Sequence, residues 1–294
     1  MEFSDKYCFF IFKPLNIICI MGHILKPRQI SVFKNSHTPT DYGPNHAYEV
    51  LNATGTANII LICEHASNYI PPEYHNLGLD MDFLDKHIAW DIGMAQLTRQ
   101  LSARLNAPAI MARFSRLLID PNREEDHKTL IPTVSDNITI PKNQTLSHKE
   151  INRRKDRFYH AFHDRTEILV KDKIQSGKVP LICGIHSFTP HMKGQHRPWQ
   201  AGMLWNKDPR LAMALIHHLT ARGYNVGDNQ PYSGRDLFFT MNRHGYDHGA
   251  PHVTIEIRQD EVSSQGGIDL WTDILNDDLT KIAQDEQLRT FKKY

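Results

Sequence analysis

Three apolar runs along the chain have the pattern of strands that are buried on both faces of a sheet. They cover residues 59–63, 179–188 and 253–258, and each is rich in Ile, Val or Leu. The first run is followed at once by a polar turn that contains His65, and the second contains His186 near its end. Because ligands collect beyond the carboxyl ends of strands in open α/β sheets, we expect both imidazoles at one edge of the sheet.

The apolar residues between these runs recur at helical spacing. This spacing predicts helices at about residues 83–106, 148–175, 208–222 and 269–287. Shorter strands are expected at residues 108–112, 115–119, 203–205 and 224–226. Strands that alternate with helices indicate an α/β fold with a mixed sheet and helices on both of its faces.

Pro and Gly residues punctuate the remaining segments. They predict an irregular lead-in over residues 22–57 and a loop over residues 242–252. We therefore expect an N-terminal extension over residues 1–50 and a single domain over residues 51–294. An apolar stretch within the first twenty residues is too short to span a bilayer and lacks the features of a signal peptide, and Met21 is an alternative start.

The charge balance narrows the classes of partner. The chain has 34 basic and 33 acidic residues, a net charge of +1, which argues against a nucleic-acid-binding surface. We also expect no membrane partner. The 4 cysteines form no C-x-x-C pair, so we expect neither a disulfide scaffold nor a structural zinc site, and we expect a reducing, cytoplasmic location. Cys63 and Cys183 lie in strand runs and are expected to be small buried hydrophobic residues.

The third apolar run contains a carboxylate, Glu256, that strengthens the functional interpretation of the two histidines. Glu256 lies inside this run, and Arg258 follows two residues later on the same face of the expected strand. An exposed face of an edge strand would also explain this pattern. Together with His65 and His186, however, Glu256 supplies the groups that metal-assisted hydrolysis requires.

Three segments resemble the active site of zinc carboxypeptidases, and they occur in the same order. They are Asp120-Pro121-Asn122-Arg123, Ile185-His186-Ser187-Phe188 and Ile255-Glu256-Ile257-Arg258. The carboxypeptidase His-x-x-Glu motif is replaced here by His65-Ala66-Ser67-Asn68, which leaves the third metal ligand open.

A closer resemblance covers nearly everything after residue 50. Five motifs are similar to those of the N-formylglutamate amidohydrolase family, in particular its divergent branch of predicted amidohydrolases: Cys63–Asn68, His87–Gly93, Ser115–Arg123, His186–Pro190 and Glu256–Asp260. The resemblance implies the phosphorylase/hydrolase-like, zinc carboxypeptidase-like α/β fold. It also implies a zinc-dependent hydrolysis of a linear amide in a small N-acyl amino acid, most simply one like N-formylglutamate.

The resemblance also implies roles for single residues. Glu256 is expected to move the proton between water and the leaving amine. His65 and His186 are expected to hold one zinc ion. His87 is the preferred third ligand because it lies near the start of the helix expected after the first strand; the alternatives are Asp91, Glu64 and Asn68.

Arginines are the candidates for binding the substrate. Asn122 and Arg123 are expected to bind its α-carboxylate, since a guanidinium group offers a bidentate fork. Arg116 and Arg197 are candidates for a second carboxylate, and Arg258 is a further candidate near Glu256. Two other functions fit the same residues: a carboxypeptidase-type peptidase or deacylase, and a catalytically silent carboxylate-binding protein.

Overall fold

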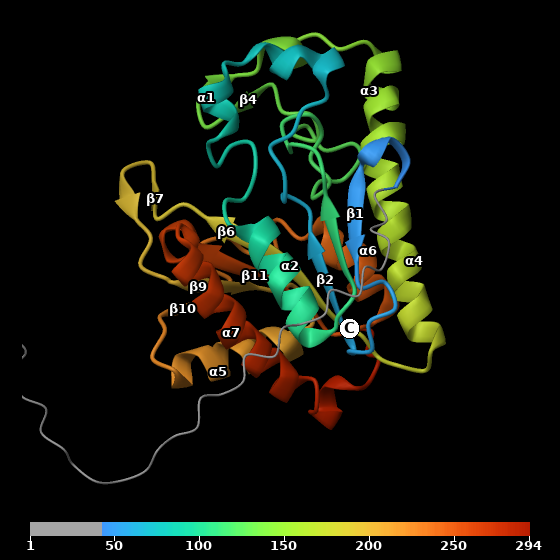
Figure 1. Ribbon diagram of the computed structural model, residues 1–294, viewed down its shortest axis with the longest axis vertical. Helices are drawn as coiled ribbons and strands as arrows, with labels where there is room; N and C mark the ends of the chain where they lie inside the picture. Colours follow the sequence, from blue (N-terminus) through green and yellow to red (C-terminus); the bar gives the residue numbers. More distant parts are fainter. Residues whose placement is uncertain (1–42) are drawn as a thin grey trace, which may run out of the picture. The chain divides into compact units, whose positions relative to one another are not determined.

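A computed structural model describes residues 43–294 of the chain. Its centre is a seven-stranded mixed sheet with the order β1-β3-β2-β6-β11-β9-β10 (Figure 1). The strands are β1 (Tyr48–Leu51), β2 (Ile59–Cys63), β3 (Ala109–Ala112), β6 (Leu181–Phe188), β9 (Ala201–Leu204), β10 (Val226–Asp228) and β11 (His252–Arg258). The expected α/β fold with a mixed sheet is confirmed.

Four neighbouring strands in the middle of this sheet, β3, β2, β6 and β11, are parallel to one another. The edge strand β1 pairs antiparallel with β3, and β9 pairs antiparallel with β11. Parallel strands end at the same edge of the sheet, so the polar residues that follow β2 and β6 meet there.

Helices cover both faces of the sheet (Figure 1). The helices are α1 (Met81–Leu84), α2 (Met94–Leu105), α3 (His148–Arg154), α4 (Ala161–Gln175), α5 (Arg210–Ala221), α6 (Phe239–His244) and α7 (Gln265–Ile282). A π-helical segment, Lys155–His160, joins α3 to α4. Residues of α4 and α6 pack on one face, and residues of α2, α5 and α7 pack on the other.

The alternation of side chains along each strand decides which face every residue serves. In β2, Ile60 and Ile62 pack toward α4, whereas Ile59 and Leu61 pack toward α2 and α7. Both faces are therefore apolar, which explains the unbroken hydrophobic run in the sequence. Two small hairpins lie outside the main sheet: β4 (Val134–Ser135) with β5 (Ile138–Thr139), and β7 (His191–Met192) with β8 (Gln195–His196).

The helix predicted at residues 83–106 is wrong in its first half. The structure has a single turn, α1, then a loop, and only then α2, which begins after Gly93. Gly93 has φ +85°, and a Cβ atom there would lie 2.9 Å from the carbonyl oxygen of Val262. The chain therefore turns at this glycine, and the backbone N–H of Asp91 donates to the carbonyl of His65 instead of to a helical partner.

Three further predictions of local structure are wrong. Residues 115–119 form a turn rather than a strand, and their apolar side chains Leu117, Leu118 and Ile119 are buried in the core. The edge strand β1 lies inside the expected irregular lead-in, and α6 lies at the start of the expected loop. In each case tertiary packing decides the conformation of a short segment whose local signals are weak.

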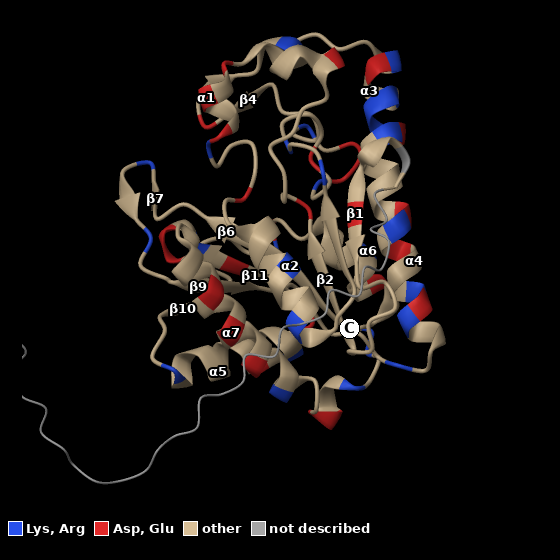
Figure 2. Ribbon diagram, viewed as in Figure 1, with Lys and Arg blue, Asp and Glu red and all other residues tan. Residues whose placement is uncertain are grey.

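Other expectations concern the surface and the thiols. Cys63 and Cys183 are buried free thiols, as expected; Cys8, Cys19 and most of the N-terminal extension lie outside the described residues. Among the described helices, none combines the length and the apolar character that crossing a membrane requires. Basic and acidic residues are interspersed along α3 and α4 (Figure 2).

Candidate active site

The register of the central strands brings three sequence-distant segments together. Ile62 of β2 is paired with Gly184 of β6, so the residues just beyond β2 lie beside the end of β6. Glu256 of β11 is paired with His186 of β6. The expectation that both imidazoles lie at one edge of the sheet is therefore confirmed.

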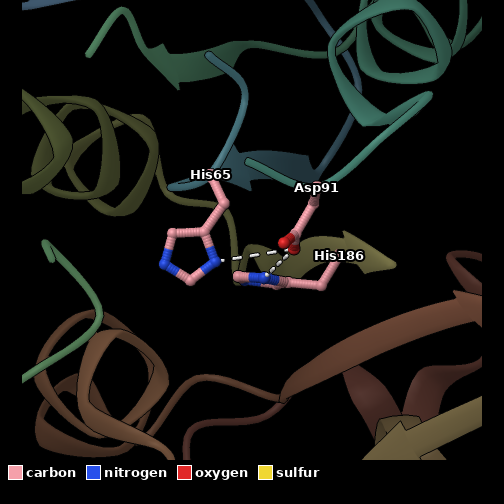
Figure 3. A group of neighbouring side chains, drawn as sticks. All are labelled: His65, Asp91 and His186. Carbon is pink, nitrogen blue, oxygen red and sulfur yellow. Dashed lines mark hydrogen bonds and ion pairs between the residues drawn. The ribbon is translucent and has the colours of Figure 1, made fainter. Parts of the chain in front are cut away.

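Two histidines and one aspartate converge at this edge (Figure 3). His65, Asp91 and His186 are all buried, and one potential ligand atom from each lies within 4.8 Å of the others. The Nδ1 atom of His186 lies 2.9 Å from Asp91 Oδ2, and the Nδ1 atom of His65 lies 3.5 Å from the same oxygen. The imidazole rings stand nearly perpendicular, with centroids 4.9 Å apart.

The other nitrogen of each ring is held by a second carboxylate. His65 Nε2 lies 2.8 Å from Asp120 Oδ1, and His186 Nε2 lies 2.9 Å from Glu64 Oε2. Because a carboxylate accepts a hydrogen bond, each Nε2 is the N–H donor. Each Nδ1 then faces Asp91 and is the ring nitrogen left for a cation, an arrangement typical of metal-binding histidines with supporting carboxylates.

Two carboxylates of the site, Asp91 and Asp120, are strongly acidic. Burial acts to raise the pKa of Asp91, but His65 and His186 outweigh it and hold that pKa below its ordinary value. Burial likewise acts to raise the pKa of Asp120, and Arg116 together with His65 lowers it well below its usual range. Both groups therefore remain ionised at neutral pH.

The donor set fits a divalent cation. His186 lies between two carboxylates, so without a cation its ring must carry a proton on both nitrogens: burial acts to lower its pKa, but Glu64 and Asp91 raise it well above the ordinary value. Within residues 43–294, His65 Nδ1 is buried and has no hydrogen-bond partner. A cation between the Nδ1 atoms and Asp91 would satisfy both observations, and two imidazoles with one carboxylate match the ligand types that zinc prefers.

Glu256 lies on an interior strand, not on an exposed edge. Its neighbours are β6 on one side and β9 on the other, and the residue is 7% exposed. Its Oε2 atom is buried and has no hydrogen-bond partner among the residues that the structure describes. Burial, reinforced by Asp91 and opposed by His186, raises the pKa of Glu256 to about 7. A carboxyl group with this pKa is suited to exchanging protons at neutral pH.

A cavity of about 170 Å³ opens over these residues. It is lined by His65, Asp91, His186 and Glu256, and also by Asn122 and Arg123. Arg123 donates through Nη1 to the carbonyl oxygen of Asn122 and through Nε to Thr129. A cavity of this volume is smaller than the pockets that hold drug-sized ligands, so it suits only a small molecule.

The other arginines differ in their positions. Arg116 lines the cavity but is paired with Asp120 at 3.0 Å and with Asp91 at 3.7 Å. Arg197 is buried behind the cavity wall, where it donates to Tyr232 and Thr189. Arg258 lies away from the cavity lining.

The guanidinium group of Arg258 is already occupied. It is paired with Asp260 at 2.7 Å and donates to backbone carbonyls of residues 197–199. Side chains two residues apart on a strand share one face, which is why the sequence favoured Arg258 as a neighbour of Glu256. Arg258 is, however, the last residue of β11, and its side chain contacts the loop at residues 197–199 instead. We therefore assign it no substrate contact.

His87 and Asn68 do not join the metal-binding group. The broken helix places His87 on the cavity wall, where its Nε2 atom lies 3.5 Å from Asp136 and its side chain is 32% exposed. Asn68 donates to the carbonyl of Leu84 and supports the loop. Of the alternatives that the sequence left open, Asp91 is the residue that the structure brings beside both histidines.

Comparison with known proteins decides the family. A family model described as N-formylglutamate amidohydrolase matches residues 57–262, more than half of the chain. The chain belongs to the N-formylglutamate amidohydrolase family. The resemblance inferred from the motifs is thereby confirmed, and the reaction class is that of a hydrolase acting on an amide.

Two solved structures are similar to this amidohydrolase. A gene product of Agrobacterium tumefaciens is 34% identical, with a TM-score of 0.78 over 80% of this chain and 94% of its own. An N-formylglutamate amidohydrolase from Ralstonia eutropha JMP134 is 18% identical, with a TM-score of 0.59 over 83% of this chain and 98% of its own, and shows the same fold. No curated protein matches the chain significantly.

Sequence reasoning missed two features of this amidohydrolase. Asp120 was grouped with the carboxylate-binding turn, yet its side chain holds His65 from 55 residues away. Tyr232 lines the cavity and accepts a hydrogen bond from Arg197. Neither contact has a local signal, because both depend on segments that meet only in the folded chain.

Proposed function

We propose that this amidohydrolase uses one zinc ion to remove a formyl or other small acyl group from an N-acyl amino acid. The convergence of His65, Asp91 and His186 is the observation that carries the proposal. The two supporting carboxylates, Asp120 and Glu64, strengthen it because they fix the Nδ1 atoms as lone-pair donors. A small-molecule substrate, and no nucleic-acid partner, agrees with the small cavity and the near-neutral charge.

The roles of the chain's own residues follow from this geometry. His65, Asp91 and His186 would hold the ion, and a bound zinc ion supplies Lewis acidity that polarises the amide carbonyl and activates water. Glu256 would accept the proton of the attacking water and pass it to the departing amine. Arg116, which lines the cavity, offsets the negative charge of Asp91 and Asp120.

Two measurements on the purified protein test this proposal. Metal analysis should find about one zinc ion per chain, and incubation with N-formyl-L-glutamate should release formate. Formate release without a bound metal would contradict the metal role. Metal binding with hydrolysis of peptides, and none of N-formyl amino acids, would favour a peptidase instead.

Replacement of Arg123 should reveal how the substrate is held. We propose that Asn122 and Arg123 bind the free α-carboxylate, so amidating that group should lower kcat/KM about a hundredfold or more. Arg123→Ala should remove the preference for the free acid, and Arg123→Lys should restore part of it, because lysine keeps the charge but lacks the bidentate fork. Steady-state kinetics on matched acid and amide substrates provide the measurement, and equal rates in the wild type would refute carboxylate recognition.

Arg197 is the candidate for selecting an acidic side chain. It is 8% exposed. Within the described part of the chain its guanidinium donates to Thr189, Tyr232 and Met192 and is joined to no carboxylate. A buried cation behind Tyr232 attracts an anion in the adjacent cavity. Arg197→Met should therefore lower the preference for N-formyl-L-glutamate over N-formyl-L-leucine about tenfold. An unchanged ratio of kcat/KM values would remove Arg197 from the specificity site.

A further inference from the structure

Two buried histidines on the α4 side of the sheet are bonded to each other. His163 on α4 and His244 on α6 are both fully buried, and His163 Nδ1 lies 3.0 Å from His244 Nε2. We call these two residues the histidine pair. Neither residue belongs to the cavity lining described above.

Both ends of the histidine pair face hydrogen-bond acceptors. His163 Nε2 lies 2.8 Å from the carbonyl oxygen of Pro121, and His244 Nδ1 lies 3.1 Å from the carboxylate of Glu167. A carbonyl oxygen and a carboxylate oxygen can only accept, so each outer nitrogen must carry a proton. The hydrogen bond between the two rings needs one more proton. The three contacts therefore require three protons on two rings, although two neutral imidazoles carry only two.

The third proton makes the pair an imidazole–imidazolium unit. Glu167 balances its charge: hydrogen bonds from His244 and His248 lower the pKa of this carboxyl group, so it stays ionised. Burial lowers the pKa of both His163 and His244, so the third proton leaves the pair at a pH below the ordinary pKa of histidine. The titratable or charged groups that face the pair are Glu167, His248, Lys171, Arg243, His160 and Glu64.

The pair is attached to the turn that carries the proposed substrate-binding residues. Pro121 stands between Asp120, which holds His65, and Asn122, which lines the cavity. Tyr159, one helical turn before His163, donates to the carbonyl oxygen of Arg123 at 2.8 Å. The backbone N–H of Thr240 on α6 donates to Asn122 Oδ1 at 3.3 Å. The helices on this face therefore hold the turn at successive points.

We propose that His163 is a positioning residue, and that the protonated histidine pair holds the Asp120–Arg123 turn in its substrate-binding geometry. The effect on substrate rests on the proposed function, whereas the proton count does not. When the third proton leaves, one of the three contacts must place two lone pairs face to face. Glu167 is ionised and is the strongest acceptor, so the His244–Glu167 hydrogen bond persists. The hydrogen bond that is lost is then either the one between the two rings or the one from His163 to the carbonyl oxygen of Pro121. The hold on the turn then weakens as pH rises.

Glu167→Gln separates the proton from the hydrogen bonds. A glutamine at this position can donate its amide N–H to His244 Nδ1 and accept from His248 with its oxygen. His244 Nε2–H then donates to His163 Nδ1, and His163 Nε2–H donates to Pro121. All three contacts are satisfied by two neutral rings, so this variant should keep the turn in place at every pH.

Steady-state kinetics of the metal-loaded enzyme on N-formyl-L-glutamate, from about pH 4.5 to about pH 8, test the positioning role, because the pKa of both histidines is lowered from its ordinary value. In the wild type, KM should rise about fivefold across the loss of the third proton, the factor expected for one hydrogen bond. In Glu167→Gln that rise should be absent, while other pH effects on kcat should be shared. His248→Gln, which changes the outer partner of Glu167 but not the pair, should keep the wild-type profile. Identical KM profiles in the wild type and Glu167→Gln would overturn the positioning role.

Nitrogen-15 spectra of histidine-labelled protein test the proton count without any substrate. Below the transition, His163 and His244 should together show three protonated nitrogens in the wild type and two in Glu167→Gln. Two protonated nitrogens in the wild type over the whole pH range would overturn the proposal. Three protonated nitrogens in a protein that does not hydrolyse N-formyl-L-glutamate would leave the pair intact and contradict the proposed function alone.

Discussion

Glu256→Gln should lower turnover by about 10²- to 10⁴-fold while the metal content stays at its wild-type value. Glutamine keeps the shape of the side chain, but its amide cannot accept the proton of the attacking water. The effect should be this large because Glu256 is the carboxyl group of the cavity whose pKa is raised to about 7, whereas Asp91 and Asp120 are held in their ionised forms. Single-turnover kinetics with formate detection, together with metal analysis, measure both quantities.

A matched control exists five residues later. Glu261→Gln makes the same chemical change outside the cavity, where Glu261 contacts Gln200 and Arg258, and it should leave turnover within about twofold of the wild type. Near-normal turnover in Glu256→Gln would move the proton transfer to another group. Loss of metal in that variant would instead make Glu256 a ligand.

Asp91→Ala should abolish metal binding and with it all turnover. Asp91 is the carboxylate that lies beside both Nδ1 atoms, and its removal leaves two imidazoles, fewer than the three protein ligands of a catalytic zinc site. His65→Ala and His186→Ala should have the same effect. Metal analysis after dialysis against a weak chelator measures the loss directly.

His87→Ala provides the comparison, because His87 is the ligand that the sequence motifs favoured. It lies on the cavity wall near Asp136, so this variant should keep about one zinc ion per chain. Full metal occupancy in Asp91→Ala together with loss in His87→Ala would reverse the assignment. That result would require the loop at residues 85–93 to close over the site when metal binds.

The local pattern of residues was sufficient to predict the elements that build the centre of the sheet. The strands β2, β6 and β11 are buried on both faces, so each appears as an unbroken apolar run. The helix at residues 83–106 was predicted incorrectly because helical spacing continues across Gly93. Its positive φ and its contact with Val262, 169 residues away, break the helix, and this contact has no local signal.

The sequence by itself determined the central strands of the sheet, the family and the residue types that the proposed chemistry needs, because apolar strand runs and family motifs are local patterns within short segments. Only the tertiary structure decided which carboxylate faces the two histidines. The strand order puts β2 beside β6, and the turn at Gly93 brings Asp91 to them in place of His87. Asp120 and Glu64 then fix which ring nitrogen is free, across 55 and 122 residues of chain. These choices depend on distances between segments, and the distances exist only once the sheet has formed.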